Sequence, residues 1–161
     1  MVKLETKGMT LAYGAKKVVE DVTLQVMPGE IVGLVGPNGS GKSTIIKALS
    51  RVIALHSGRV LINGRDISQI KRKELSLLIS VVPQTPILPS AFTAFEIVLM
   101  GRHPHLSLLQ YEGPKDVDIT WQAMEQTSTQ CLAERRVGEL SGGEIQCVVI
   151  ARALAQQTQS I

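Results

Sequence analysis

A glycine-rich segment between an apolar run and a helical pattern constrains the fold of this chain most strongly. Residues 36–43 read Gly-Pro-Asn-Gly-Ser-Gly-Lys-Ser and match the pattern G-x-x-x-x-G-K-[ST]. The nearly continuous apolar residues 30–35 are typical of a strand buried on both faces of a parallel sheet. Residues 43–50 have the apolar spacing of a helix. This order of strand, loop and helix predicts an α/β fold.

The same segment predicts a phosphate-binding loop. Glycines let successive backbone N–H groups point inward at phosphate oxygens, and the following helix directs its positive N-terminal end at the same anion. Lys42 would then reach the β- and γ-phosphates, and the Ser43 hydroxyl would bind Mg²⁺. The alternative is a glycine-rich turn that only resembles the pattern.

The rest of the chain predicts alternating strands and helices. Strands are predicted at residues 2–11, 22–26, 30–35, 59–62 and 78–82. Helices are predicted at residues 43–50, 93–100, 115–126 and 142–156. In the first helix the apolar face would hold Ile45, Ile46 and Leu49. Thr93 and Glu96 have the spacing of a capping box. The proline-rich residues 83–92 predict an ordered loop, residues 101–114 an irregular segment, and residues 158–161 the start of a strand.

A second motif, Leu140-Ser-Gly-Gly-Glu144 with Gln146 close behind, stands at the start of the last predicted helix. Ser141 can cap that helix, and two glycines allow a ligand to approach the backbone closely. A helix N-terminus is a second anion-binding position. Taken alone, the pattern is equally typical of a simple N-cap.

Residues 36–44, Gln84 and residues 140–146 together resemble the Walker A loop, Q-loop and signature motif of ABC-type ATPases. The resemblance covers nearly the whole chain, and the motifs stand in the family's order. Residues 96–105 resemble the subgroup that powers import of iron-siderophore, haem and cobalamin. The implied fold is a P-loop NTPase core with an antiparallel β subdomain and a helical subdomain. The β subdomain and core would span about 1–92, the helical subdomain about 93–140, and the signature helix about 141–157.

The resemblance implies a role for each matched residue. Tyr13 would stack on adenine, although a turn residue that packs locally is the alternative. Gln84 would contact Mg²⁺ or the attacking water and sense the membrane subunit, whereas a lone glutamine in a loop is otherwise solvated. The implied catalytic residues are Gln84 and Lys42, and the implied metal ligands are Ser43 and Gln84. The implied ATP contacts are Tyr13, Gly36, Asn38, Gly39, Ser40, Gly41, Lys42, Ser43, Thr44, Ser141, Gly142 and Gly143.

The family's quaternary arrangement implies the partners. Two ATPase chains pair head to tail, so that Ser141, Gly142 and Gly143 would bind the γ-phosphate held by the other chain. Residues 86–105 would receive the coupling helix of a transmembrane permease, which places the protein at the cytoplasmic face of the inner membrane. His103 and His105 favour surface residues near that partner over a metal site, because no third ligand accompanies them.

The sequence departs from the family at one decisive position. The family has a Walker B strand ending in Asp-Glu after the signature helix, and the 161 residues contain none. We therefore expect an ABC ATPase domain that is incomplete at the C-terminus, poorly stable alone and inactive in hydrolysis. Smaller departures are Cys147, where arginine is usual, and residues 127–129, where a glycine-containing turn is usual.

Composition narrows the alternatives. A formal net charge of +3 and 3% aromatic residues argue against nucleic acid as a partner. Two cysteines without metal-ligand spacing fit a reducing compartment. The chain shows neither a leader segment nor an apolar run long enough to span a membrane. The remaining alternatives are a nucleotide-binding module that does not hydrolyse ATP, a soluble ABC ATPase of DNA repair or translation, and a P-loop kinase or GTPase.

Overall fold

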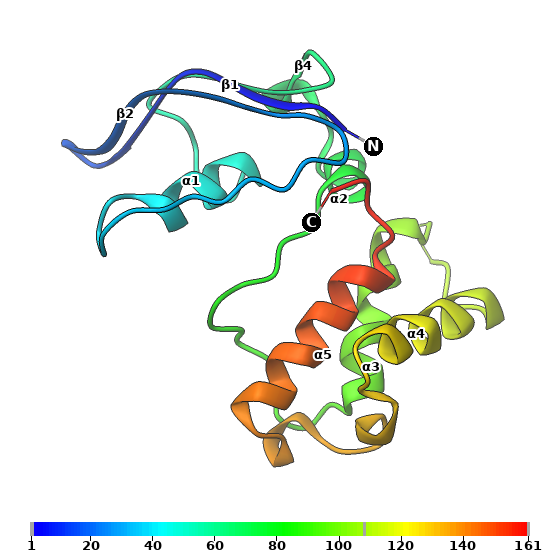
Figure 1. The fold of residues 1–161 in the computed structure, drawn as a ribbon. Coiled ribbons are helices and arrows are strands. Elements are labelled where there is room, and N and C mark those ends of the chain that lie inside the picture. The colour runs from blue at the N-terminus through cyan, green and yellow to red at the C-terminus, as the bar shows by residue number, and fades with distance from the viewer. Residues whose placement is uncertain (1, 108, 161) are drawn as a thin grey trace. The chain divides into compact units, whose positions relative to one another are not determined.

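The computed structural model describes residues 2–107 and 109–160 (Figure 1). The chain divides into two compact units, of which the first ends at Leu75 and the second runs from Ser76 to Gln159. The first unit contains all four strands, and the second is helical. The predicted mixed α/β class is therefore confirmed. None of the helices formed by the described residues has the length and apolar character needed to cross a bilayer.

The first unit is built on an antiparallel sheet with the order β2-β1-β3-β4. Its strands are β1 (Leu4–Tyr13), β2 (Lys16–Val26), β3 (Ser57–Ile62) and β4 (Arg65–Asp66). The predicted strands at 2–11, 22–26 and 59–62 are thus confirmed, although β1 lies two residues later than predicted and β2 and β3 begin earlier. The strands bury a set of apolar side chains, among them Leu4, Met9, Leu11, Val19, Val60 and Ile62.

Helix α1 (Lys42–Leu49) packs against β1 and β2, which confirms the predicted helix (Figure 1). Its buried side chains are Ile45 and Ala48, whereas Ile46 is exposed. The predicted apolar face is therefore wrong at Ile46, because the helix turns the small Ala48 toward the sheet instead. After β4, the Arg51 guanidinium donates to Ile67 O of the 3₁₀ helix η1 (Ile67–Gln69) and to Ile70 O just after it.

The predicted buried strand at residues 30–35 is wrong. The segment has no strand structure, and Ile31 and Val35 are both 99% exposed. A strand needs a neighbour for its N–H and C=O groups. The sheet formed by the described residues contains only β1 to β4, so this segment has no strand partner among them.

The predicted strand at residues 78–82 is also wrong. Helix α2 (Arg72–Leu78) takes its first residue, Ile79 forms only an isolated bridge, and residues 80–82 have no regular structure. The segment 71–78 carries Lys71, Arg72, Lys73 and Glu74 before its apolar residues, and this polar start favours a helical turn with Leu75 buried.

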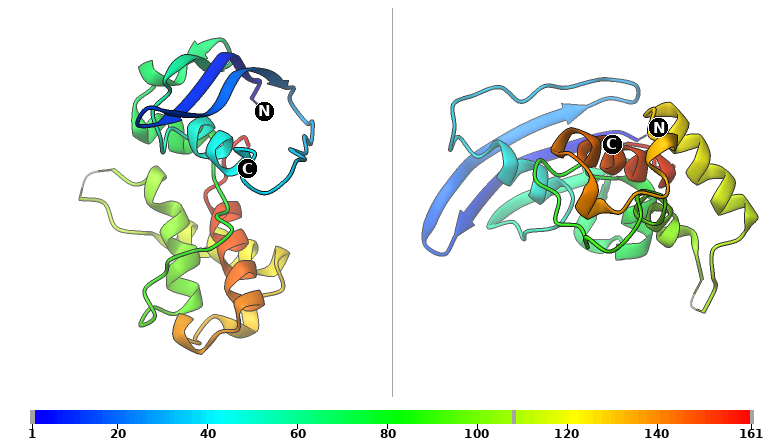
Figure 2. Two further views of the ribbon diagram at one scale, coloured as in Figure 1. Left: turned by 90° about the vertical axis from the view of Figure 1, so that its left-hand side faces the viewer. Right: turned by 90° about the horizontal axis from the view of Figure 1, so that it is seen from below.

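The second unit contains three principal helices. These are α3 (Ala94–Leu99), α4 (Pro114–Gln126) and α5 (Gly142–Ala155), and all three predictions are confirmed. Three short 3₁₀ helices connect them: η2 (Met100–His105), η3 (Gln130–Leu132) and η4 (Val137–Glu139). The segment 101–114, predicted to be irregular, is therefore 3₁₀-helical in its first part. Helices α3 and α5 pack against each other, and the left view of Figure 2 shows them side by side.

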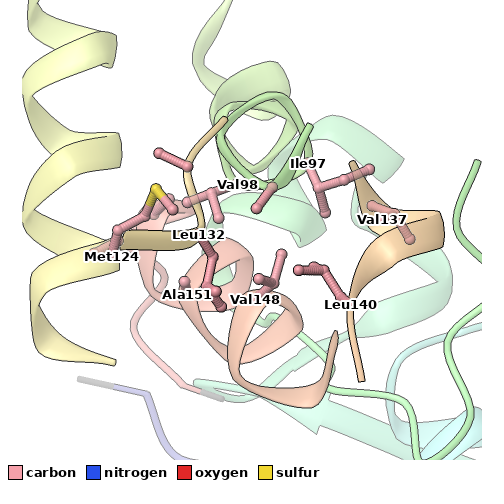
Figure 3. Packing of buried hydrophobic residues seen from close by; sticks show 12 residues of the cluster. Ile97, Val98, Met124, Leu132, Val137, Leu140, Val148 and Ala151 are labelled. Carbon is pink, nitrogen blue, oxygen red and sulfur yellow. The ribbon is translucent and has the colours of Figure 1, made fainter. Parts of the chain in front are cut away.

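The core of the second unit lies between α3, α4 and α5 (Figure 3). Ile97 and Val98 of α3 meet Met124 of α4 and Val148 of α5, and all four are fully buried. Leu132, Val137 and Leu140 come from the segment between α4 and α5 and close the same cluster. This packing fixes the start of α5, because Leu140 precedes it directly.

Candidate functional site

The glycine-rich loop of residues 36–41 connects residues 30–35, which form no strand, to α1. Gly39 and Gly41 have φ values of +81° and +90°, which side chains other than glycine rarely adopt. Gly41 also lies against β2, where an added Cβ would stand 2.5 Å from Val19 Cγ2. The loop needs glycine at these two positions because of its backbone conformation and, at Gly41, because of packing.

Lys42 folds back over this loop. Its Nζ donates to Gly36 O at 2.8 Å and to Pro37 O at 2.7 Å, and it lies 3.4 Å from Ser40 Oγ. All three acceptors belong to the loop, so the ammonium group is placed among the residues predicted to surround a phosphate.

The N-terminus of α1 has the electrostatics of an anion site. No side chain caps it, and its first turn contains no acidic residue. Its first N–H groups therefore have no partner within the helix and carry the positive end of the helix dipole. The Ser43 side chain in this turn is exposed, and Thr44 is half-buried. Together with Lys42, this donor set fits a polyphosphate.

Tyr13 is the last residue of β1 and is paired with Lys16 across the turn to β2. Its side chain is 53% exposed. A ring that is half-exposed at the end of a strand can offer apolar surface to a ligand.

Gln84 lies in the second unit, at a bend of the segment 81–93. Its side chain is exposed, and the neighbouring Ile87 is 98% exposed. The predicted ordered loop at 83–92 is confirmed, since the segment contains neither helix nor strand. It ends at Thr93, which caps α3 through a reciprocal capping box with Glu96.

The signature segment is also shaped by a capping box. Ser141 Oγ accepts from the Glu144 N–H at 3.3 Å, while Glu144 Oε2 lies 2.7 Å from both Ser141 N and Ser141 Oγ. Ser141 therefore caps α5, as predicted. Glu144, by contrast, received no role in the sequence analysis. The spacing S-x-x-E could have identified it as the partner of Ser141 in a capping box.

Gly142 and Gly143 form the exposed first turn of α5. Neither has a positive φ, and a Cβ built on either would meet nothing within 4 Å. Neither the backbone nor the packing of this chain therefore requires glycine here. What the two glycines provide is an unobstructed approach to N–H groups that have no partner within the helix.

Glu144 is in turn held by Arg135. The guanidinium NH1 lies 3.0 Å from Glu144 Oε1, and NH2 donates to Glu139 O at 2.6 Å. Hydrogen bonds from the Ser141 side chain and backbone lower the pKa of Glu144, and the charge of Arg135 lowers it further. Glu144 is thus anionic at neutral pH. No sequence pattern indicated Arg135, because the fold alone brings it to the start of α5.

The structure places the predicted residues in two groups. Tyr13 and residues 36–44 lie in the first unit, and Gln84 and residues 141–143 lie in the second. Within the first group, the loop and Lys42 are in direct contact.

His103 and His105 of η2 have separate partners. His103 Nε2 lies 3.6 Å from Glu112 Oε1, whereas His105 Nε2 is hydrogen-bonded to Gln156 O at 2.8 Å. In residues 2–107 and 109–160, no group of three or more His, Cys, Asp or Glu side chains could hold a metal ion. Cys131 and Cys147 are free and exposed thiols.

Comparison with known proteins identifies similar chains. Residues 19–161 match the family described as ABC transporter. The chain is 41% identical over 159 residues to the iron(3+)-hydroxamate import ATP-binding protein FhuC of Bacillus subtilis, covering 99% of this chain and 59% of that protein. It is 37% identical to the manganese transport system ATP-binding protein MntB of Listeria innocua, covering 97% of this chain and 64% of the relative.

Solved structures agree. The fold matches the crystal structure of a nucleotide-free ATP-binding cassette from an ABC transporter with a TM-score of 0.82 and 30% identity, over 98% of this chain and 66% of that one. The chain spans about three fifths of the length of the curated relatives it matches. Since the family match extends over most of the sequence and the fold agrees with it, this chain belongs to the ABC transporter family of ATP-binding proteins.

Proposed function

We propose that this chain is the ATP-binding part of an importer's ATPase subunit, which couples ATP binding and hydrolysis to uptake of a metal chelate such as iron-siderophore, haem or cobalamin. The iron(3+)-hydroxamate relative supports this substrate class. The manganese relative favours a bare metal ion as the alternative cargo.

The observation that carries the ATP-binding role is the loop of residues 36–41 with Lys42 at its centre and the uncapped, acid-free start of α1 behind it. In the proposed site the loop N–H groups of Gly36, Asn38, Gly39, Ser40 and Gly41 hold the phosphates. Lys42 neutralises the β- and γ-phosphates, and Tyr13 stacks on the base. Thr44, half-buried beside Ser43, completes the phosphate contacts.

In the proposed site, Mg²⁺ would bind together with the nucleotide. The Ser43 hydroxyl is the ligand that the phosphate loop offers, and it is exposed. Gln84 is the second proposed ligand and would also orient the attacking water. The metal would supply charge neutralisation on the phosphates, while Ser43 holds it at the start of α1.

The signature residues Ser141, Gly142 and Gly143 are proposed to bind the γ-phosphate carried by a second ATPase subunit. Their exposure and the open space at both glycines support this role. The exposed loop with Gln84 and Ile87 is proposed to contact a permease, which would place the protein at the cytoplasmic face of the membrane. Residues 1–92, 93–140 and 141–157 remain the proposed functional divisions.

Binding of Mg-ATP to the 161-residue chain, measured by calorimetry, tests the site. Lys42→Ala is expected to weaken binding about tenfold or more, because a hydrogen-bonded charge on the phosphates is lost. Lys47→Ala removes the same charge from the last turn of the same helix and is the matched control. A Lys42→Ala variant that binds as well as Lys47→Ala would contradict the assignment.

Turnover separates hydrolysing from non-hydrolysing function. Phosphate release is measured for the 161-residue chain and for a chimera in which the remaining segment of the iron(3+)-hydroxamate relative follows it. We expect both to bind Mg-ATP and only the chimera to hydrolyse it, since the 161 residues lack an Asp-Glu pair after α5. Binding without turnover in both would favour the non-hydrolysing module. Turnover by the 161-residue chain would contradict the assigned catalytic roles.

A further inference from the structure

An acidic side chain stands at the proposed γ-phosphate contact. Glu144 Oε2 lies 2.7 Å from both the N and the Oγ of Ser141, directly beside the first turn of α5. The carboxylate is anionic at neutral pH like an ordinary glutamate, and the hydrogen bonds from Ser141 lower its pKa further. An uncompensated negative charge at this distance would oppose a phosphate approaching Gly142 and Gly143.

The carboxylate also engages the hydrogen-bonding groups of Ser141. Oε2 accepts from its N–H and hydroxyl, and Ser141 Oγ accepts from the Glu144 N–H. The donors of this segment that have no partner within the helix are the N–H groups of Gly142 and Gly143. A phosphate that binds here therefore first meets these two amides, and Glu144 is the acidic residue of the same helix turn.

Arg135 compensates that charge from a fixed position. One guanidinium nitrogen contacts Glu144 Oε1 at 3.0 Å, and the other donates to Glu139 O at 2.6 Å. The Arg135 backbone carbonyl accepts from the Ala94 N–H at 2.9 Å, which anchors the residue to the start of α3. The backbone of Arg135 and its guanidinium group are thus both anchored, although the side chain is 43% exposed.

We propose that Arg135 is a positioning residue of the signature site, which neutralises Glu144 and holds its carboxylate on Ser141 so that a phosphate can bind the Gly142 and Gly143 amides. This inference rests on the proposed nucleotide-binding function. The alternative role of the pair is an ordinary surface ion pair, which would contribute little to folding and nothing to binding.

Removing the negative charge of Glu144 distinguishes a neutralising role of Arg135 from a purely structural one. Glu144→Gln keeps an oxygen that can cap the helix but removes the negative charge. If Arg135 acts by neutralising Glu144, the loss caused by Arg135→Met disappears when Glu144→Gln is present. If Arg135 only stabilises the local structure, the double variant stays as weak as Arg135→Met, because the guanidinium contacts are still missing.

The experiment is an NMR titration of the ¹⁵N-labelled 161-residue chain with inorganic pyrophosphate at low, constant ionic strength, followed at the Gly142 and Gly143 amides. Arg135→Met is expected to weaken apparent binding about three- to tenfold. The double variant Arg135→Met/Glu144→Gln should return to within about twofold of the wild type, and Arg135→Lys should preserve most of the affinity, since the charge is kept. Arg136→Met removes the same charge one residue away and should change binding less than about twofold.

Several outcomes would overturn the proposal. The first is a double variant that binds pyrophosphate as weakly as Arg135→Met does. The second is an Arg136→Met variant that loses as much affinity as Arg135→Met. The third is that the Gly142 and Gly143 amides of the wild type do not respond to pyrophosphate. The proposed function is tested separately in the same samples, by the response of the Gly39 and Gly41 amides to Mg-ATP. If these fail to respond, the nucleotide site itself is wrong, whatever the outcome at α5.

Discussion

Arg102 and Asp116 form an ion pair inside the helical unit, with Arg102 Nε 2.9 Å from Asp116 Oδ1. Both residues are buried, with exposed fractions of 3% and 9%. The guanidinium also donates to Ala155 O at 2.7 Å and to Gln157 Oε1 at 3.1 Å. Arg102 therefore joins η2 to the start of α4 and the end of α5, the helix that presents the signature residues at its other end.

Replacing Arg102 by methionine is expected to lower the free energy of unfolding by about 3–5 kcal/mol, because the buried Asp116 carboxylate loses its charged partner. Ala155 O would lose a hydrogen bond at the same time. Urea unfolding followed by circular dichroism measures the change. The exposed pair Arg65–Glu74 is the control, and Arg65→Met should cost no more than about 1 kcal/mol. Equal effects of the two substitutions would show that burial of the Arg102 pair contributes nothing.

Acid should weaken the protein partly through Asp116. Hydrogen bonds from the Gly113 N–H and from Arg102 lower its pKa below the ordinary aspartate value in the folded state. A carboxylate with a lowered folded pKa contributes stability that is complete above the unfolded pKa, about 3.9, and is lost as the pH falls through the folded value. The wild type should thus lose stability more steeply below about pH 4 than Asp116→Asn does. Parallel pH profiles from urea unfolding would contradict this assignment.

Local patterns predicted the helix caps and the start of α1 well, because these structures depend on residues that are close in sequence. The spacing of Thr93 and Glu96 specified a capping box, and the same spacing at Ser141 and Glu144 produced another. Likewise, Lys42 lies on the loop that precedes it by only a few residues. In each case the interacting groups are close in sequence, so no knowledge of the tertiary fold was needed.

Contacts between distant segments could not be predicted in this way. Arg102 meets Asp116 and Ala155 only because three helices pack together, and the surrounding sequence carries no sign of its burial.

Residues 30–35 show the opposite error, because burial was predicted there and the segment is exposed. Their apolar run indicated a buried strand, but burial requires neighbouring strands, and the sheet of the described residues offers none to this segment.

The phosphate-binding loop should be sensitive to side chains at Gly41 in particular. Gly41→Ala places a Cβ at φ +90° and 2.5 Å from Val19 Cγ2, so both the backbone and β2 have to shift. Gly39→Ala, at φ +81° with nothing within 4 Å, bears only the backbone cost of about 1–2 kcal/mol. We expect Gly41→Ala to unfold at a clearly lower urea concentration than Gly39→Ala. Identical midpoints would mean that the contact with Val19 relaxes without cost.

The exposed apolar segment before the loop provides a direct test of its conformation. Ile31 and Val35 are each 99% exposed, so Ile31→Thr and Val35→Thr should change the free energy of unfolding of the 161-residue chain by no more than about 0.5 kcal/mol. Val60→Thr in β3 is the matched control, because Val60 is fully buried and its hydroxyl-bearing replacement should cost about 1–3 kcal/mol. If the substitutions at 31 and 35 cost as much as the one at 60, the segment is buried in solution.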